Sequence, residues 1–449
     1  MEISGSIVTP QEHSELDMFT YTLLHKSGFK FSPDDPQAVH EDRMRGIIRF
    51  GPYRKVTKPP QIAFVFPNGF RDQANTLYLA LRNGIGLFKG LPSVFKVPLE
   101  KDQVVAITGF TLRNRFDHHD SALRYRDAIQ NWINLNGSTP DLFVNLHPKS
   151  MGWEDDSAYS ATKAVLLKDG LLSQNVTFEL IQNSTQFEWS VANIALGVFV
   201  KLGGIPWAVN RADGENEFVI GMGRSESYDQ RTRERERSIA FTTSLQSNGI
   251  YEFGNFGSAC GDKAAFMREL ENTLRNTIAQ MRLRKPNAAA LTLHFPKDFS
   301  FDERELCKKV AADASTSIPR IEFVKVTEED RFFAIDDESP DQVPRRGTCI
   351  KLSNTDFLLY TEGSEERQTW VNRPPSAVRI RHYGEFGADL PTREIIGQVF
   401  DLSLSNWRAF NARGYPVSIF YSKLISRILQ HADLSDVHGT HLSDRMWFL

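Results

Sequence analysis

The feature that most constrains the fold of this chain is a repeated pairing of a short apolar run with an amphipathic helix. Residues 62–66 (IAFVF) form the first apolar run, and the helix predicted after it begins at Asp72 and stops at Asn83-Gly84. A short apolar run between polar segments is typical of a buried strand, and Asn-Gly commonly ends a helix. This pair therefore predicts one strand and one helix packed on the same sheet.

The same pattern recurs twice before residue 171. Residues 104–110 and 141–147 are the next predicted strands. The helix after the first of these has its apolar side chains on one face and ends at Asn136-Gly137, and the helix after the second covers residues 159–168. Alternating strands and helices imply a parallel sheet with helices on its faces, so the expected fold class is α/β. Such sheets bind ligands at the carboxyl ends of their strands.

The alternation begins again after Trp207 and predicts a second α/β domain. A chain of 449 residues is too long for one core, since single cores stop growing at about 250–300 residues. The predicted strands of this part are residues 218–223, 290–295, 321–326, 349–353, 357–360 and 377–383, and the predicted helices are residues 266–281, 303–314, 394–410 and 418–429.

Residues 1–54 are expected to form a small N-terminal extension. The segment is polar and interrupted by prolines, and its one apolar run is RGIIRF at residues 45–50. Because this run contains two adjacent isoleucines and precedes a Gly51-Pro52 turn, we predict a strand there.

Composition excludes several classes of protein. The formal net charge is −3, so no global positive field indicates a nucleic-acid binder and any phosphate site must be local. The three cysteines (Cys260, Cys307 and Cys349) lie far apart, which argues against a disulfide framework or a zinc site and favours a reducing cytoplasm. The start of the sequence lacks the pattern of a signal peptide, and the longest apolar run, residues 194–200, is far shorter than the ~18 residues of a membrane span. We therefore expect a cytoplasmic protein without a membrane partner.

Four polar residues stand out in the middle of the chain. Tyr159 and Lys163 are four residues apart and share one face of a predicted helix. Gln174 follows that helix, and Lys201 ends the apolar helix of the stretch NIALGVFVKLGGIPW, just before a Gly-Gly turn. Two lysines, a tyrosine and an amide could together bind a terminal phosphate through charge-assisted hydrogen bonds. Spacing alone does not distinguish such a site from four unrelated residues.

A resemblance to a known family gives these residues a role. The order Tyr159, Lys163, Gln174, Lys201 and the LGGIPW sequence resemble the guide-binding motif of the MID domain of argonautes. FVIGMG, LTLHFPK, GTCIKLS, AVRIRHY and the terminal segment from NWRAF to MWFL resemble the PIWI domain of the same family. The resemblance implies a Rossmann-like MID domain at residues 55–205 and an RNase H-like PIWI domain at residues 206–449. With no room for a PAZ half, the chain resembles a short prokaryotic argonaute.

The resemblance also implies how the site is used. It assigns Tyr159, Lys163, Gln174 and Lys201 to the 5′ phosphate of a small guide, with Tyr159 also stacking on the first base. In this family the terminal carboxylate, here that of Leu449, enters the same pocket. Since carboxylate and phosphate repel each other, a Mg²⁺ ion held between them is expected, with Gln174 and Leu449 as its protein ligands.

The positions that carry the nuclease carboxylates in the family are altered in this chain. Where the resemblance places these acids, or a final acid or histidine, the sequence has Gly223, Pro296 and Lys423. None of these side chains binds a metal ion, and slicing by RNase H-like folds requires carboxylates around two metal ions. We therefore expect no cleavage by this chain. The competing hypothesis is a nuclease with displaced carboxylates, for which Glu226 and Asp229 are the nearest candidates.

The expected function is therefore guide-directed recognition without slicing. The family favours an RNA guide over DNA, a single-stranded DNA target, and an associated APAZ-containing effector of sirtuin-like, TIR-type or nuclease class that acts in defence. Arginines such as Arg224, Arg379 and Arg381 are candidates for the duplex channel. The alternative that is not an enzyme is a stand-alone DNA-binding protein. The sequence does not exclude that the chain forms a homodimer.

Overall fold

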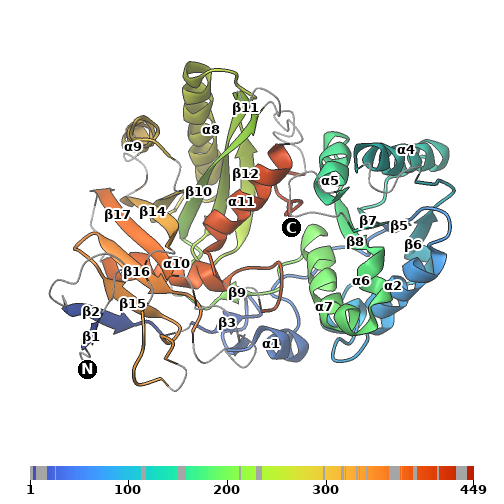
Figure 1. The fold of residues 1–449 in the computed structure, drawn as a ribbon, viewed down its shortest axis with the longest axis horizontal. Coiled ribbons are helices and arrows are strands. Elements are labelled where there is room, and N and C mark those ends of the chain that lie inside the picture. Colours follow the sequence, from blue (N-terminus) through green and yellow to red (C-terminus); the bar gives the residue numbers. More distant parts are fainter. Residues whose placement is uncertain are drawn as a thin grey trace.

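The chain folds around two main sheets, one of four and one of ten strands, which lie side by side (Figure 1). This is a computed structural model. It describes residues 4–6, 18–25, 27–112, 118–149, 158–211, 214–228, 235–296, 299–314, 318, 320–329, 332, 334–339, 342–363, 375, 377–387, 392–411, 414–430 and 442–449. Every structural statement below concerns these residues.

The four-stranded sheet is parallel throughout, as the sequence predicts. Its strand order is β6-β5-β7-β8. The strands are β5 (Ile62–Val65), β6 (Val104–Ile107), β7 (Leu142–His147) and β8 (Ser173–Thr177). Strands β5 and β7 are fully buried, which explains why β5 is a continuous apolar run and why β7 has only Asn145 and His147 as polar residues.

Helices cover both faces of this sheet. One face packs on α4 (His118–Asn136) and α5 (Ala158–Lys168), where the Tyr125, Ile129 and Leu166 side chains meet Ala63 and Val65 of β5. The other face packs on α2 (Arg71–Asn83), α6 (Phe178–Gln182) and α7 (Ser184–Lys201). Short segments α3 (Leu91–Val94) and the 3-10 turn η1 (Lys101–Gln103) connect α2 to β6. This arrangement is the Rossmann-like fold expected for the first domain.

The ten-stranded sheet is mixed, with the order β1-β2-β15-β16-β17-β14-β13-β10-β11-β12. Its three central strands β10, β13 and β14 are parallel to one another, and the remaining neighbours are antiparallel. The strands are β1 (Ser4–Ser6), β2 (Met18–Leu23), β10 (Glu217–Tyr228), β11 (Arg235–Gln246), β12 (Tyr251–Phe256), β13 (Ala290–Phe295), β14 (Arg320–Glu329), β15 (Thr348–Lys351), β16 (Asp356–Tyr360) and β17 (Ala377–Gly387).

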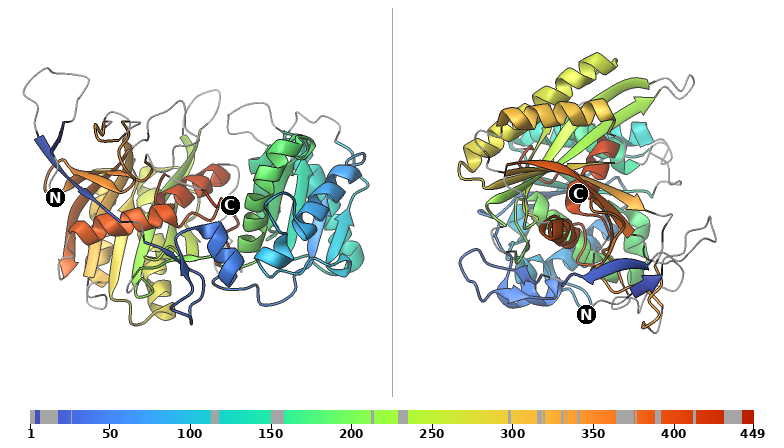
Figure 2. Two further views of the ribbon diagram at one scale, coloured as in Figure 1. Left: turned by 90° about the horizontal axis from the view of Figure 1, so that it is seen from below. Right: turned by 90° about the vertical axis from the view of Figure 1, so that its left-hand side faces the viewer.

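Two pairs of helices cover the two faces of this sheet (Figures 1 and 2). On one face, α8 (Lys263–Arg284) and α9 (Phe301–Ala314) pack on Phe218, Ile220 and Met222 of β10. On the other face, α10 (Thr392–Leu404) and α11 (Val417–Leu429) pack on Val324 and Val326 of β14. A central mixed sheet with helices on both faces is the RNase H-like arrangement expected for the second domain.

The predicted strand at residues 45–50 is wrong, because this segment belongs to helix α1 (Arg43–Phe50). The Asp42 side chain caps the helix by accepting a hydrogen bond from the Arg45 main-chain N–H at 2.7 Å. The Arg43 guanidinium is buried and donates to the main-chain oxygens of Leu404 and Phe410, both at 2.6 Å. These long-range contacts, which local sequence does not contain, favour the helix.

The N-terminal segment is also more integrated than an appended extension. Strand β2 pairs with β15, so β1 and β2 extend the ten-stranded sheet. A separate three-stranded sheet combines β3 (Phe29–Lys30) and β4 (Val39–His40) with β9 (Ala208–Val209), the strand that follows the Gly-Gly turn after α7. Residues from the start of the chain thus contact both main sheets.

Two further differences concern the second half of the chain. The antiparallel strands β11 and β12 were not predicted between β10 and α8. Helix α10 ends at Leu404, and not near residue 410, because the following loop buries Trp407 and presents main-chain oxygens to Arg43. No helix among the described residues is both long enough and apolar enough to cross a membrane.

Candidate phosphate-binding site between the two sheets

Lys163 lies on helix α5 and contacts the last residues of the chain. Its side chain is 1% exposed, and its ammonium group donates hydrogen bonds to the main-chain oxygens of Trp447 at 2.7 Å and Leu449 at 2.5 Å. Burying an ammonium group is costly unless its N–H groups find acceptors, so these two oxygens hold Lys163 in place. The contact joins the four-stranded sheet domain to the C-terminal segment.

Gln174 and Lys201 form the second part of the site. Gln174 lies on strand β8, and Lys201 is the last residue of helix α7 and is fully buried. The Lys201 ammonium donates a hydrogen bond to the Gln174 side-chain oxygen. Gly197, one turn earlier on α7, faces the same amide, because a Cβ atom at this position would lie 2.9 Å from the Gln174 oxygen. The glycine therefore makes the close approach of helix and strand possible.

Both positions of the Gly-Gly turn after Lys201 require glycine, each for a different steric reason. Gly203 has φ of +89°, a conformation that side chains disfavour. Gly204 has no such strain, but a Cβ atom there would lie 2.2 Å from the Phe199 ring. The turn ends α7 at Lys201 and leads the chain into β9, which fixes where the ammonium group lies.

The site brings two buried ammonium groups close together. Burial lowers the pKa of Lys201 to about 7, and the positive charge of Arg408 lowers it as well. Burial also lowers the pKa of Lys163 well below its usual range, and the charges of Lys201 and Arg408 add to this effect. Two buried ammonium groups and the exposed guanidinium of Arg408 thus act on one another. An anion bound among them would relieve their repulsion and raise both lysine pKa values.

Arg408 is the contributor that sequence reasoning missed. It lies in the loop between α10 and α11, more than 200 residues from either lysine, and its side chain is exposed. Because Arg408 lies in a loop far along the chain, no helix or strand periodicity links it to the two lysines. The only available signal was its place in NWRAFNARGYP, a segment that resembles the end of the PIWI domain.

Tyr159 lies on helix α5, one turn before Lys163, as its spacing predicts. The structure does not describe the position of the Tyr159 side chain. Its assignment to the guide 5′ end therefore stays a prediction. By contrast, the structure brings Lys163, Gln174, Lys201 and Leu449 into one connected group of contacts.

The C-terminal segment that supplies the two oxygens is firmly packed. Trp447, Phe448 and Leu449 are all buried. The Phe448 ring lies 5.2 Å from the ring of Tyr421 on α11, and the Arg445 guanidinium donates to the main-chain oxygen of Lys201 at 3.2 Å. The segment therefore connects the ten-stranded sheet domain with both lysines.

Gly197 gives a direct test of the site's geometry. We expect Gly197→Ala to displace the Gln174 amide and to weaken the binding of any phosphate ligand at Lys201 by roughly tenfold, the effect of one lost hydrogen bond to a charged group. Ala is a better helix former than Gly, so thermal denaturation should show little loss of stability. Unchanged affinity in a binding titration would show that Gln174 has no role in the site.

The three positions at which the resemblance places the nuclease acids lie on the ten-stranded sheet, directly after one of its strands, and on the helix that covers it. Gly223 is on β10, Pro296 directly follows β13, and Lys423 is on α11. A Cβ atom at residue 223 would lie 2.2 Å from the ring of Phe241 on the neighbouring strand β11. The Lys423 ammonium lies 3.7 Å from a carboxylate oxygen of Glu328 and 4.0 Å from the centre of the Tyr415 ring.

The candidate displaced carboxylates are engaged elsewhere or undescribed. Glu226 lies 3.4 Å from the guanidinium of Arg224, which also binds the buried carboxylate of Glu303 at 2.8 Å. Asp229 lies outside the described residues. Arg379 and Arg381, candidates for the duplex channel, both contact the Asp356 carboxylate on β16, at 3.1 and 2.8 Å. Arg224 is likewise held by carboxylates, so ion pairs restrain all three candidate channel arginines.

The two sheets and the lysine site between them define a protein with a Rossmann-like MID domain and an RNase H-like PIWI domain. The model of the Piwi domain family matches residues 151–433, and the chain belongs to this family. This agrees with the resemblance found in the sequence.

Curated relatives are argonautes of prokaryotes. Protein argonaute of Cereibacter sphaeroides is 23% identical over 418 residues, which cover 86% of this chain and 53% of the relative. A Piwi protein of Archaeoglobus fulgidus is 22% identical over 316 residues, covering 65% of this chain and 71% of the relative. The chain thus spans about half the length of the Cereibacter argonaute.

Solved structures show the same fold. Drosophila Piwi superposes with a TM-score of 0.73 at 15% identity, covering 97% of this chain and 57% of that one. Clostridium butyricum Argonaute, solved with a guide DNA and a 19-mer target DNA, has a TM-score of 0.68 at 14% identity and covers 92% of this chain and 53% of that one.

Proposed function

We propose that this protein binds the 5′-phosphorylated end of a small guide, which in turn selects a complementary single-stranded DNA target. The observation that supports this most directly is the burial of Lys163 and Lys201 beside each other with depressed pKa values. A terminal phosphate would accept hydrogen bonds from both ammonium groups, and its negative charge would offset their mutual repulsion. Argonautes with bound guide and target share the fold.

The guide is proposed to be RNA, and specificity would come from base pairing. The protein would follow the backbone and the A-like shape of the guide-target duplex, as proteins do when a guide reads the sequence. The overall charge of −3 agrees with a local phosphate site and not with general attraction to nucleic acid. Arg408 would add a third positive group near the guide's first phosphate.

The experiment that tests the proposal is isolation of the nucleic acid that copurifies with the chain. Its sugar type, length and 5′ end are determined with and without phosphatase treatment. We expect short 5′-phosphorylated RNA from the native protein and its loss from a Lys163→Ala/Lys201→Ala variant. Copurified nucleic acid of random length, without a 5′ phosphate, would contradict the proposal and favour a stand-alone DNA-binding protein.

We also propose that Mg²⁺ joins the 5′ phosphate to the chain, with the Gln174 side chain and the carboxylate of Leu449 as its protein ligands. The donor set fits, because an amide oxygen and a carboxylate are the oxygen ligands that Mg²⁺ prefers. Gln174 binds Lys201 and the Leu449 main-chain oxygen accepts from Lys163, so both candidate ligands already lie at the lysines. When bound, the ion would supply charge that neutralises phosphate and carboxylate together.

Removal of Mg²⁺ is therefore expected to weaken guide binding selectively. The affinity for a 5′-phosphorylated guide is measured first with Mg²⁺ and then with an excess of chelator. We expect the chelator to weaken binding by roughly tenfold or more, which corresponds to the loss of about one charge-assisted contact. A 5′-hydroxyl guide of the same sequence is the control, and its affinity should not respond. An equal response of the two guides would show that Mg²⁺ acts on the nucleic acid and not at this site.

We propose that the chain does not slice its target. The Phe241 ring occupies the space that a side chain at residue 223 would need, and Lys423 places an ammonium group at a position that a metal-binding acid or histidine holds in the family. Incubation of the guide-loaded protein with labelled target and Mg²⁺ tests this. Cleavage opposite the guide would instead support a nuclease with displaced carboxylates.

Activity would then come from a partner, proposed to be an APAZ-containing effector of sirtuin-like, TIR-type or nuclease class in a defence system. The relative from Cereibacter is about twice as long as the region it shares with this chain, so a partner could supply the missing surface. Leu87 and Trp189 are 78% and 72% exposed and follow two residues, Gly86 and Glu188, that lie against each other. Exposed tryptophans are enriched where proteins bind each other, so Trp189 is the candidate contact residue for such a partner.

A further inference from the structure

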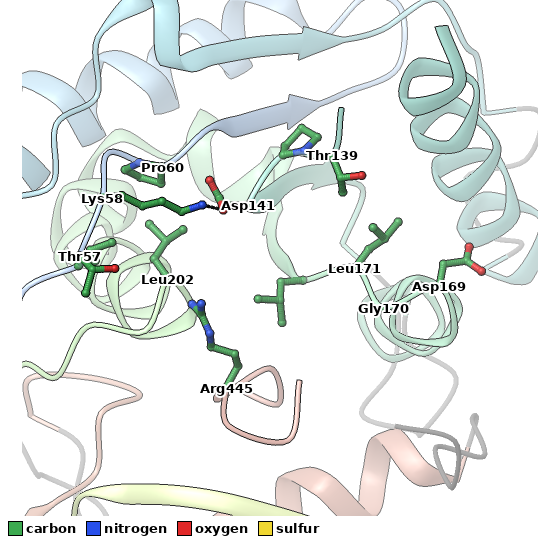
Figure 3. A pocket seen from close by; sticks show the side chains of 13 residues that line it. Thr57, Lys58, Pro60, Thr139, Asp141, Asp169, Gly170, Leu171, Leu202 and Arg445 are labelled. Carbon is green, nitrogen blue, oxygen red and sulfur yellow. Dashed lines mark ion pairs between the residues drawn. The ribbon is translucent and has the colours of Figure 1, made fainter. Parts of the chain in front are cut away.

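A cavity of about 410 Å³ lies behind the lysine site, at the amino ends of strands β5, β7 and β8 (Figure 3). Three parts of the chain that are distant in sequence enclose it. They are the linker before β5 with Lys58 and Pro60, the starts of β7 and β8 with Asp141 and Leu171, and the turn and tail residues Leu202 and Arg445. Ligands in such α/β domains usually bind at the opposite, carboxyl edge, so the fold alone does not account for a cavity here.

Arg445 gives the cavity its most distinctive group. Figure 3 shows its side chain pointing between Leu202 and Leu171. One guanidinium nitrogen donates to the Lys201 main-chain oxygen at 3.2 Å, and no carboxylate of a described residue lies within 4 Å of the others. A guanidinium has five N–H donors, so most of its capacity to bind an anion is unused in this contact.

The remaining charges leave a local positive excess. The Lys58 ammonium lies 3.8 Å from a carboxylate oxygen of Asp141, and the other oxygen of that carboxylate accepts from the main-chain N–H of Gln61 at 2.9 Å. Asp169, at the far side of the cavity in Figure 3, accepts a hydrogen bond from the Gln130 side chain. Both acidic groups are thus already engaged, whereas Arg445 binds only a carbonyl oxygen.

The other walls combine two threonines, Thr57 and Thr139, with apolar side chains. Leu171 and Leu202 are each 6% exposed, and Pro60 and Pro140 close the side near the linker. The volume lies within the range of roughly 300–1,000 Å³ that holds small organic ligands. A ligand that fits must therefore combine a negatively charged end with a flat or apolar body.

We propose that this cavity binds a small organic phosphate of the size of a nucleoside monophosphate. Its phosphate group lies between Lys58 and Arg445, and its body lies against Leu171 and Leu202. The guanidinium binds two phosphate oxygens at once, since its donor geometry matches that of a phosphate.

The cavity is connected to the guide site through Arg445. This residue contacts the main-chain oxygen of Lys201, and the same tail carries the two oxygens, of Trp447 and Leu449, that bind Lys163. A ligand that moves or stiffens Arg445 changes the positions of both lysines. Coupling between the sites, which rests on the proposed guide binding, is then reciprocal: the ligand changes guide affinity by the factor by which the guide changes ligand affinity.

The first measurement is binding of adenosine monophosphate by calorimetry. A Lys163→Ala/Lys201→Ala protein is used, so that the guide site cannot bind the probe and the result does not depend on guide loading. We expect saturable binding of one equivalent, weakened at least about tenfold by Lys58→Gln and by Arg445→Gln, because each loses a contact to a charged group. Arg268→Gln, an exposed arginine on α8, is the matched control and should bind unchanged.

Two further arms identify what the cavity recognises. Inorganic phosphate and adenosine should each bind more weakly than the monophosphate, because each fills one part of the cavity. Adenosine binding as well as the monophosphate would overturn the assignment of Lys58 and Arg445 to a phosphate. Absence of binding, or binding unaffected by Lys58→Gln and Arg445→Gln, would overturn the site.

The second measurement tests the coupling in the otherwise native protein. The affinity for a 5′-phosphorylated guide is determined with and without saturating adenosine monophosphate, in the native chain and in Lys58→Gln. We expect a shift in guide affinity in the native chain only, since Lys58 makes no contact with the guide lysines. A shift that persists in Lys58→Gln would mean that the probe competes in the guide site, and would overturn the coupling. A protein that binds the probe in the cavity but loads no guide would refute the proposed function and leave the cavity assignment intact.

Discussion

A Lys163→Ala/Lys201→Ala variant is expected to bind 5′-phosphorylated guides at least about 100-fold more weakly than the native protein. Each substitution removes an ammonium group from a volume that water reaches poorly, and one hydrogen bond to a charged group contributes about 1.5–3 kcal/mol. Two such losses correspond to a factor of at least about 100 in affinity. Pairing between guide and target should be unaffected, because neither lysine reads the sequence.

The measurement compares guides that differ only in a 5′ phosphate or a 5′ hydroxyl. The native protein should prefer the phosphate, and the double variant should bind both guides equally. Lys168→Ala is the matched control, because this exposed lysine lies on the same helix α5. If the double variant keeps the preference for the phosphate, the 5′ end is bound elsewhere.

The pH dependence of this preference has a defined sign. In the free protein the pKa of Lys201 is lowered to about 7 by burial, so its charge is lost as pH rises through 7. A bound phosphate raises the pKa of Lys201, because an opposite charge favours the protonated form. The complex therefore holds more protons than the free protein above pH 7, and affinity falls with increasing pH in that range. A preference that grows with pH would contradict the assignment of Lys201.

The sequence predicts the four-stranded sheet well because its strands are buried on both faces. Strand β5 has four buried residues in a row, all of them apolar, so its burial appears directly as an apolar run in the sequence. Strand β11 gives no such signal, although it is also buried. Its buried residues include Thr242 and Thr243, whose hydroxyl groups lie 2.6 Å from that of Thr277 on α8 and 3.4 Å from the main-chain oxygen of Gly221, respectively. Polar residues that are satisfied by tertiary contacts hide a strand from a pattern of hydrophobicity.

The candidate site was predictable only in part, for a similar reason. Lys163, Gln174 and Lys201 belong to one local motif, so a resemblance could identify them together. Arg408 and Arg445 come from the other domain, and their places beside the lysines depend on how the C-terminal segment packs between the two sheets. That packing depends on contacts such as the one between the rings of Phe448 and Tyr421. Hydrophobic periodicity in the sequence does not predict such contacts.

Gly223→Asp introduces an acid where the resemblance places the first nuclease carboxylate, and it is expected to destabilise the protein by about 3–5 kcal/mol without producing cleavage. Residue 223 is buried, and a Cβ atom there would lie 2.2 Å from the Phe241 ring. The new side chain would add overpacking to the cost of a buried charge with no partner. Pro296 and Lys423 would still lack the carboxylates that a two-metal site requires. Chemical denaturation measures the loss, and a target-cleavage assay with Mg²⁺ measures activity.

Two companion variants separate the causes of this loss. Gly223→Ala has the steric conflict without the charge, so it should be destabilised less than Gly223→Asp. Combining Gly223→Asp with Phe241→Ala makes room for the carboxylate and should recover part of the stability, although the cavity left by the ring has its own cost. If Gly223→Asp alone is as stable as the native protein, the Phe241 ring moves aside easily. The position would then be open to a carboxylate, and the proposed lack of slicing would depend on Pro296 and Lys423 alone.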